Sequence, residues 1–178
     1  GRFAGKGSDS LGRHSWMKFC GRLRSIKIYT FYRVSQESGN GIGDTKAYVQ
    51  QYNLLNENYG KQVENNTGDD QNGTPFKIIN PRTAILESLL KDIRKDIKEK
   101  TLIILLGGLN ENVLGAKFIE KLSDLGIKNA IQMNLGGEKY RTQNRGRHCI
   151  DGMWVSCTLL PHIQRMGIAP FSDIFDSD

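Results

Sequence analysis

Residues 102–112 read LIILLGGLNEN, and this stretch decides the fold. Five apolar residues run without interruption at its start and meet two glycines, after which Asn110, Glu111 and Asn112 follow. A short apolar run that ends at glycines is typical of a buried strand. In open α/β sheets, ligands bind where such strands end. The stretch predicts a central strand with a ligand-facing loop; the alternative is a strand followed by an ordinary polar turn.

The polar end of this stretch carries side chains suited to phosphate chemistry. The amide of Asn110 can hold a phosphate oxygen, and the carboxylate of Glu111 can hold a hard cation such as Mg²⁺. Glu111 could equally be a solvated acid in a surface loop. Both interpretations stay open from this stretch alone.

Regular elements are expected on both sides of the central strand. A strand over 26–32 is indicated by the β-branched and aromatic residues of IKIYTFY. Residues 1–15 are rich in glycine, serine and arginine and predict a loop. Further strands are expected over 14–19, 130–134 and 149–158, and helices over 45–59 and 116–125, the latter ended by Gly126.

The helix over 81–99 has the clearest pattern in the chain. Asn80 is its expected N-cap and Pro81 its first helical residue. Arg82 falls outside the apolar stripe, which consists of Ile85, Leu86, Leu89, Leu90, Ile93 and Ile97. Strands that alternate with helices predict an α/β protein. We expect a single domain over 1–178, with a polar surface insertion at about 60–79 and a glycine-rich turn at 39–43.

The basic residues are unevenly distributed. The chain of 178 residues has a net charge of +6, yet residues 1–33 alone hold eight basic side chains and one acid. A second basic cluster consists of Lys139, Arg141, Arg145 and Arg147. Two basic clusters on a near-neutral body favour a polyanionic partner, with nucleic acid as the first candidate, although ordinary solvated surface would give the same counts.

The three cysteines are Cys20, Cys149 and Cys157, and no two of them have CxxC spacing. This usage predicts a reducing, intracellular environment, nuclear or cytoplasmic, without a disulfide-linked partner. No apolar run approaches the length of a membrane span and no signal peptide is visible, so a membrane partner is not expected.

Four motifs in order now point to a family. They are IYTFYRV at 28–34, LLGGLNEN at 105–112, RTQNRGRHCIDGMWVS at 141–156 and FDSD at 175–178. The set resembles the endonuclease/exonuclease/phosphatase superfamily of metal-dependent phosphodiesterases, and its retroelement endonuclease-like branch in particular. The resemblance implies a four-layered α/β sandwich, in which two mixed sheets face each other with helices outside, here incomplete at the N-terminus.

The resemblance also implies roles for individual residues. Tyr32 would lie near the scissile phosphate, and Asn110 would bind the phosphate and the attacking water. Asp151 would be the catalytic carboxylate of the third motif, and Asp178 belongs to the terminal motif. The implied substrate-binding residues are Arg33, Thr142, Arg145 and Ser156, and Glu111 is the candidate metal ligand for Mg²⁺, with Mn²⁺ as the alternative ion.

Three departures from the family pattern weaken the expected activity. Gly108 stands where the family has the aspartate that orients or deprotonates water, the terminal histidine is absent, and the strands with the metal-binding asparagine and glutamate would precede residue 1. Loss of one member of a catalytic unit typically costs orders of magnitude in rate. We therefore expect a weakly active or inactive chain.

Three functions remain in contention on sequence grounds. The first is a metal-dependent DNA endonuclease that is impaired by Gly108. The second is a nucleic-acid-binding remnant of such a domain without activity. The third, a nucleotide-binding domain that uses Gly107 and Gly108 as a phosphate loop, lacks both a GxGxxG motif and a P-loop lysine.

Overall fold

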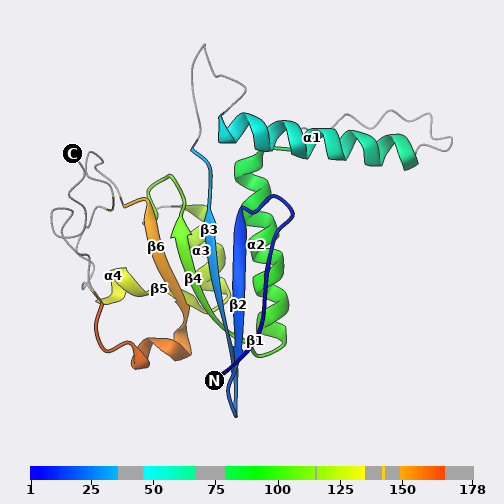
Figure 1. Ribbon diagram of the computed structural model, residues 1–178. Helices are drawn as coiled ribbons and strands as arrows, with labels where there is room; N and C mark the ends of the chain where they lie inside the picture. The colour runs from blue at the N-terminus through cyan, green and yellow to red at the C-terminus, as the bar shows by residue number, and fades with distance from the viewer. Residues whose placement is uncertain (36–45, 67–78, 115, 135–141, 143–148, 167–178) are drawn as a thin grey trace, which may run out of the picture.

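The computed structural model describes residues 1–35, 46–66, 79–114, 116–134, 142 and 149–166. Within these ranges the chain forms one six-stranded mixed sheet with strand order β1-β2-β3-β4-β6-β5 (Figure 1). Only β3 and β4 are parallel, and every other pair is antiparallel. The strands are β1 (Arg2–Ser8), β2 (His14–Cys20), β3 (Ser25–Tyr32), β4 (Leu102–Gly108), β5 (Ile127–Asn129) and β6 (Asp151–Ser156).

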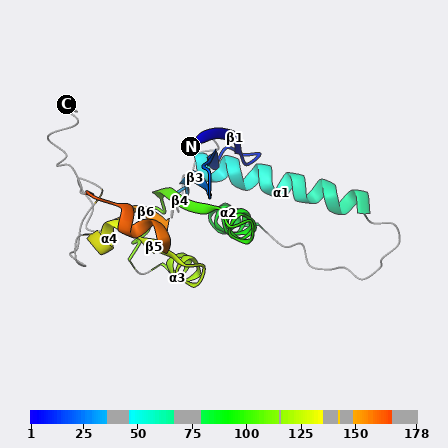
Figure 2. The ribbon, with the colours of Figure 1, turned by 90° about the horizontal axis from the view of Figure 1, so that it is seen from below.

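The two helices that cover the sheet lie on the same face of it. Helices α2 (Pro81–Lys98) and α3 (Lys117–Asp124) pack against one face, whereas α1 (Ala47–Asn66) projects away from the sheet at one end of α2 (Figures 1 and 2). Two short helical segments, α4 (Ala130–Asn134) and η1 (Cys157–His162), lie beside β5 and β6. The α/β class is confirmed. The expected second sheet is not found among the described residues, so the four-layered sandwich stays a prediction.

The core forms where the sheet meets α2 and α3. One row of paired residues across the strands, Trp16, Tyr29, Leu105 and Trp154, points to the helices. Tyr29, Leu105 and Trp154 are completely buried, together with Ile85, Leu89 and Ile93 of α2 and Leu122 of α3. Burying one large apolar side chain contributes about 1.5–3 kcal/mol to the free energy of unfolding. The buried residues of this row and of the apolar stripe of α2 therefore supply most of the stability of the fold.

The opposite face of the sheet is apolar and carries no described helix. The next row, Met17, Ile28, Ile104 and Val155, points to this side, as do Phe3 and Phe19, whose rings are 5.9 Å apart. Phe3 and Met17 are each 53% exposed. A strand that buries only one face normally alternates apolar and polar residues, and the central strands here do not. We call this surface the open face.

Several expected elements are confirmed and several are wrong. The strands at 14–19 and 26–32 correspond to β2 and β3, and the α2 helix starts as expected, with the Asn80 side chain accepting from the Arg82 N–H at 2.8 Å. The helix expected over 45–59 continues to Asn66, into the expected insertion. The turn expected at 39–43 lies outside the described residues.

Two strand assignments are corrected. Residues 1–15 were expected to be a loop, but β1 pairs with β2 there, and its glycines make room for a ring: a Cβ on Gly7 would lie 2.8 Å from Trp16. Residues 130–134 are helix α4 rather than a strand, because Asn129 accepts from the Gln132 N–H at 3.0 Å and starts a helix. The strand lies just before it, at β5.

A buried polar group lies between β2, β3 and α2. Lys27 Nζ is 2.9 Å from Asp96 Oδ2, and the Tyr29 hydroxyl donates to the same carboxylate. The Nζ atom of Lys27 also lies 4.0 Å from the centroid of the Trp16 ring. Burial raises the pKa of Tyr29, and the hydrogen bond to Asp96 adds to the rise. The phenol is therefore a permanent donor here, and Asp96 holds two buried groups at once.

His14 gives the stability of this region a pH dependence. The side chain is 2% exposed, its Nε2 atom is 3.4 Å from Ser88 Oγ, and burial lowers its pKa below the usual 6.5, against the opposing charges of Asp9 and Asp92. Because the unfolded chain then binds the proton more readily, stability is complete above about pH 6.5 and falls as the pH drops below it.

We therefore expect the urea midpoint of unfolding to decrease between pH 7.5 and pH 5.5. A His14→Gln variant keeps a polar side chain that does not titrate, so it should lose this part of the pH dependence while carboxylate titration at lower pH persists. Identical midpoint-versus-pH curves for the two proteins would show that His14 does not control stability in this range.

Candidate functional site

The candidate site lies where β3 and β4 end and β6 begins, at the edge of the open face. Tyr32 pairs with Gly108, and Gly108 pairs with Asp151, so these three residues form one row across the sheet. We call them the terminal row. Tyr32 is 58% exposed and Asp151 is also exposed. The structure thus brings together two residues that are far apart in sequence, with Gly108 between them.

Gly108 lies within contact distance of both neighbours. A Cβ placed on it would be 2.7 Å from Asp151 Oδ1 and 3.8 Å from the Tyr32 ring. The first of these atoms is the free end of a side chain, which can rotate away. A carboxylate at position 108 would therefore lie directly beside that of Asp151. In this chain, Asp151 is the one acidic residue of the terminal row.

Thr142 joins the terminal row from the loop before β6. Its hydroxyl oxygen accepts from the backbone N–H groups of Ile150 and Asp151, at 3.0 and 3.1 Å. Because the oxygen accepts both bonds, its own hydrogen remains directed away from the backbone and can be donated to a ligand. Thr142 thus both fixes the start of β6 and offers a donor next to Asp151.

Three other expected residues lie on the helix side of the same strand ends. Arg33 Nη1 is 2.6 Å from Glu111 Oε2, and Arg82 Nη2 is 3.4 Å from the same oxygen. The Asn110 side chain donates to the Arg33 carbonyl at 2.5 Å, and Asn110 has a left-handed backbone with φ of 49°. These groups hold the β3 and β4 ends together. A cavity of about 640 Å³ lies beside them, between α2 and α3, and Arg33, Glu111 and Phe118 are among the residues that line it.

Arg82 is the part of this arrangement that the sequence analysis misplaced. It was expected outside the apolar stripe, but it is 6% exposed, and it donates to the Val34 carbonyl. Burial lowers its pKa, as does the neighbouring Arg33, while Glu111 opposes both. Arg82 lies three residues before Ile85 and seven before Leu89, and this spacing places it on the buried face of α2. Its burial could therefore have been predicted from the sequence.

Ser156 lies at the opposite end of the sheet. It ends β6, whereas Asp151 begins it, so the two residues are about 16 Å apart along the strand. The Ser156 hydroxyl oxygen accepts from the Ile103 N–H at 2.8 Å. It does not join the terminal row. Arg145 and Asp178 lie outside the described residues, so their expected roles stay predictions.

The residues present do not fit a magnesium site as they stand. Among the described residues, no three His, Cys, Asp or Glu side chains lie together as an ion would require. The terminal row offers one carboxylate, and the carboxylate of Glu111 is already held by two guanidinium groups. Mg²⁺ is usually bound by one or two carboxylates together with water and substrate phosphates. We therefore expect the single carboxylate of the terminal row to hold the ion only weakly.

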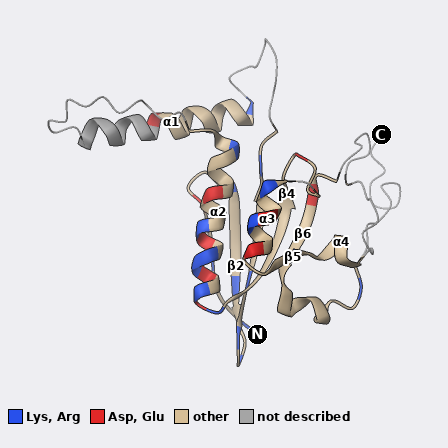
Figure 3. Ribbon diagram, turned by 180° about the vertical axis from the view of Figure 1, so that it is seen from behind, with Lys and Arg blue, Asp and Glu red and all other residues tan. Residues whose placement is uncertain are grey.

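Folding pairs half of the N-terminal basic residues with acidic side chains. Of its eight basic residues, four form ion pairs: Arg13 with Asp9, Lys18 with Glu99, Lys27 with Asp96, and Arg33 with Glu111. Three of these acids come from residues 96–111, beyond the basic cluster. In the part of the chain that the structure describes, Arg2, Lys6, Arg22 and Arg24 form no ion pair. Figure 3 shows blue and red residues interleaved along α2.

The comparisons with known proteins give structural similarity at low identity. No protein-family model and no curated protein matches the chain. Solved structures that do match include the human Nocturnin catalytic domain (11% identity, TM-score 0.45), D. rerio TDP2 with a single-strand DNA product (11%, 0.42) and Staphylococcus aureus beta toxin (13%, 0.40). Each match covers 87% of this chain, and 48%, 53% and 50% of the other chain, respectively.

This chain spans about half the length of the structures that it matches. A further match, from Leptotrichia buccalis, is named an endonuclease/exonuclease/phosphatase family protein (14% identity, TM-score 0.29), and it covers 80% of this chain and 42% of that chain. The superfamily and its retroelement branch remain expectations from the motifs. No described helix combines the length and the apolar character needed to cross a membrane.

Proposed function

We propose that this chain is a phosphodiesterase-type DNA-binding domain, and that the terminal row is where it contacts the phosphodiester backbone. The observation that carries the proposal is the row itself, which places Tyr32, Gly108 and Asp151 side by side on an exposed edge of the sheet. The motif order in the sequence supports the same assignment, and the net charge of +6 is compatible with a polyanion.

The side chains of this edge suit a phosphate group in specific ways. The Tyr32 hydroxyl and the free hydroxyl hydrogen of Thr142 can each donate a hydrogen bond to a phosphate oxygen. The exposed Tyr32 ring also offers a surface on which a base can stack. Asp151 opposes a phosphate unless a cation lies between them, so we expect modest affinity that falls with added salt.

Gly108 explains why binding should occur without efficient cleavage. A nucleophilic water needs a base or a metal ion to activate it, and the terminal row holds one carboxylate where two could fit. In-line attack of water on phosphorus is therefore the reaction that this arrangement has lost. The impaired endonuclease is our first proposal, and a binding domain that has no cleavage chemistry to restore is the second.

A gain-of-function variant separates these two proposals. With Mg²⁺ present, we expect supercoiled plasmid to be nicked at background rate by this chain and about tenfold faster by Gly108→Asp, because two adjacent carboxylates can share a cation. Gly108→Asn, which adds the same bulk without charge, should stay at background. Adding Asp151→Asn to Gly108→Asp should abolish the gain.

The outcomes divide cleanly. Nicking that depends on both carboxylates and on Mg²⁺ supports the impaired endonuclease. Salt-sensitive DNA binding without nicking by any variant supports the second proposal. Binding that is absent at low salt, or unchanged in a Tyr32→Ala variant, would contradict the placement of the contact at the terminal row.

A further inference from the structure

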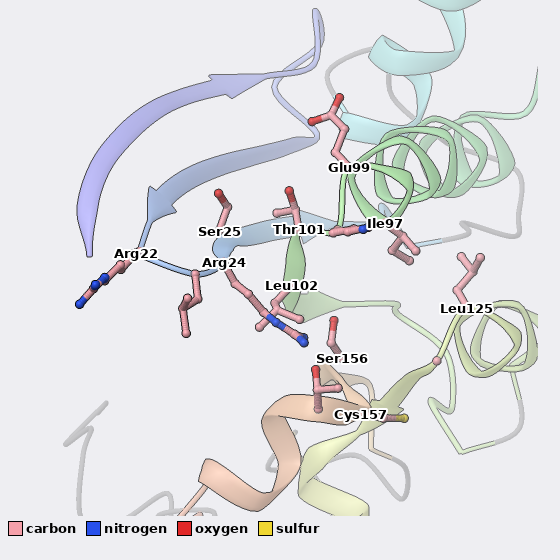
Figure 4. Close-up of a pocket in the computed structure, with 15 residues that line it drawn as sticks. Arg22, Arg24, Ser25, Ile97, Glu99, Thr101, Leu102, Leu125, Ser156 and Cys157 are labelled. Carbon is pink, nitrogen blue, oxygen red and sulfur yellow. The ribbon is translucent and has the colours of Figure 1, made fainter.

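We propose a second ligand site, at the end of the sheet opposite the terminal row, that binds a phosphate-bearing molecule of mononucleotide size. A cavity of about 700 Å³ lies there, between the β2–β3 turn, the end of α2 and the start of η1 (Figure 4). Small-molecule sites typically measure about 300–1,000 Å³. Along β3, this end is about 23 Å from Tyr32, so the two sites are separate.

Two of the four basic residues of the N-terminal cluster that form no described ion pair lie at this cavity, together with Lys100. Arg22, Arg24 and Lys100 all line it, and within the described residues none of the three forms an ion pair. In Figure 4 the Arg24 side chain extends from the turn toward Ser156, whereas Arg22 points outward. Arg24 is therefore the expected anchor, because its planar guanidinium binds two phosphate oxygens at once.

The backbone around the cavity keeps these groups in place. The Gly21 N–H donates to the Arg24 carbonyl at 2.9 Å and closes the turn that carries the arginine. Lys100 follows α2 with a left-handed backbone at φ of 58°, and its N–H donates to the Ile97 carbonyl at 2.9 Å. The Thr101 N–H donates to the Asp96 carbonyl at 2.9 Å and the Glu99 N–H to the Lys95 carbonyl at 3.2 Å. With the Ile97 carbonyl, three of the carbonyls at this helix end are thus occupied and present less negative charge to an anion.

Ser156 provides a neutral donor on the cavity floor. Its oxygen accepts from the Ile103 N–H, so the hydroxyl hydrogen is free to be donated to a phosphate. Glu99 is the one acid that lines the cavity in the described part of the chain, and Lys18 lies 3.6 Å from its carboxylate. The described lining thus carries a surplus of positive charge around a hydroxyl donor.

An apolar wall completes the site and sets the ligand class. Ile97, Leu102 and Leu125 line the cavity beside the charged groups. Leu23 also lines it and is 92% exposed, the highest value among the exposed large apolar side chains of the described residues. A flat apolar base next to a phosphate would cover these leucines while the phosphate meets Arg24. A bare inorganic anion would leave them in water.

The test is a titration of AMP, with inorganic phosphate and adenosine as matched partial ligands. We expect AMP to bind more tightly than either part, and Arg24→Gln to weaken AMP binding about tenfold, since one charge-assisted bidentate contact is lost. Arg94→Gln removes an equal charge from the exposed side of α2 and should change the affinity by less than about twofold.

Cysteine alkylation gives a second readout on the same sample. Cys157 lines the cavity and is exposed, and Cys20 is exposed but is not a lining residue. At AMP concentrations near ten times the dissociation constant, alkylation of Cys157 should slow by about tenfold while that of Cys20 stays constant. Mass spectrometry follows both sites in one reaction.

Several results would overturn the site. They are an absence of AMP binding at millimolar concentration, equal affinity for adenosine and AMP, and equal losses in Arg24→Gln and Arg94→Gln. A loss of DNA binding in Arg24→Gln without any AMP binding would also overturn it, in favour of a nucleic-acid surface. A Tyr32→Ala variant should bind AMP normally, so failure of this site and failure of the terminal row are told apart.

Discussion

Replacing Gly107 with alanine is expected to leave the protein largely unfolded at 25 °C. A Cβ at this position would lie 2.1 Å from the Phe31 carbonyl oxygen and 2.6 Å from the Phe31 ring. The oxygen belongs to the backbone of β3, so relief requires β3 and β4 to separate at the centre of the sheet. We expect a cost above about 4–5 kcal/mol, comparable to the whole stability of a marginal domain.

Gly126 provides the matched control. It has a left-handed backbone at φ of 72°, and a Cβ there would meet nothing within 4 Å. Gly126→Ala therefore carries only the conformational cost of about 1–2 kcal/mol. Circular dichroism and the fluorescence of buried Trp154, followed through urea unfolding, measure both variants. Equal midpoints for the two would show that the contact with Phe31 is not what requires glycine at 107.

Replacing Asp96 with alanine is expected to cost about 3–5 kcal/mol, because it strands a buried charge. Lys27 is 8% exposed and Asp96 is 4% exposed. Without the carboxylate, the ammonium of Lys27 keeps only the Trp16 and Tyr29 rings, and the Tyr29 hydroxyl loses its acceptor. Both effects act in the core, where water cannot replace the lost partner.

A more exposed ion pair between β2 and the end of α2 is the control for this prediction. Lys18 and Glu99 are 3.6 Å apart, and the Glu99 side chain is 48% exposed, so Glu99→Ala should cost no more than about 1 kcal/mol. Combining Lys27→Met with Asp96→Asn removes the charge but keeps an acceptor for Tyr29, and should recover most of the loss. If the Asp96→Ala and Glu99→Ala variants unfolded at the same urea concentration, this result would contradict the buried-pair account.

The sequence was most informative where one periodic pattern decided the structure. The stripe of α2, its cap at Asn80 and the run at 102–106 all led to correct elements, because apolar spacing reports directly which face is buried. An element whose own residues give no strand pattern was missed. Strand β1 contains glycines that disfavour a strand locally, and it exists because β2 pairs with it and Trp16 fills the space.

The candidate site divides in the same way. The proximity of Tyr32, Gly108 and Asp151 could be anticipated, because all three end or begin strands that the motifs marked. The ion pairs of Lys27 and Arg33 could not be read from charge counts, since their partners lie in the other half of the chain. Counting charge along residues 1–33 therefore overstated the positive surface that remains after folding.

The order of pairing in the sheet has a consequence for how the chain reaches this structure. Strands β1, β2 and β3 follow one another and pair through short turns, so this meander can form within a small part of the chain. The β3–β4 pair joins residues 26–32 to 102–108, with both long helices in between. Closing so long a loop is entropically costly and slow. During refolding β3 should persist as an unpaired edge, and the yield of native protein should fall as concentration rises.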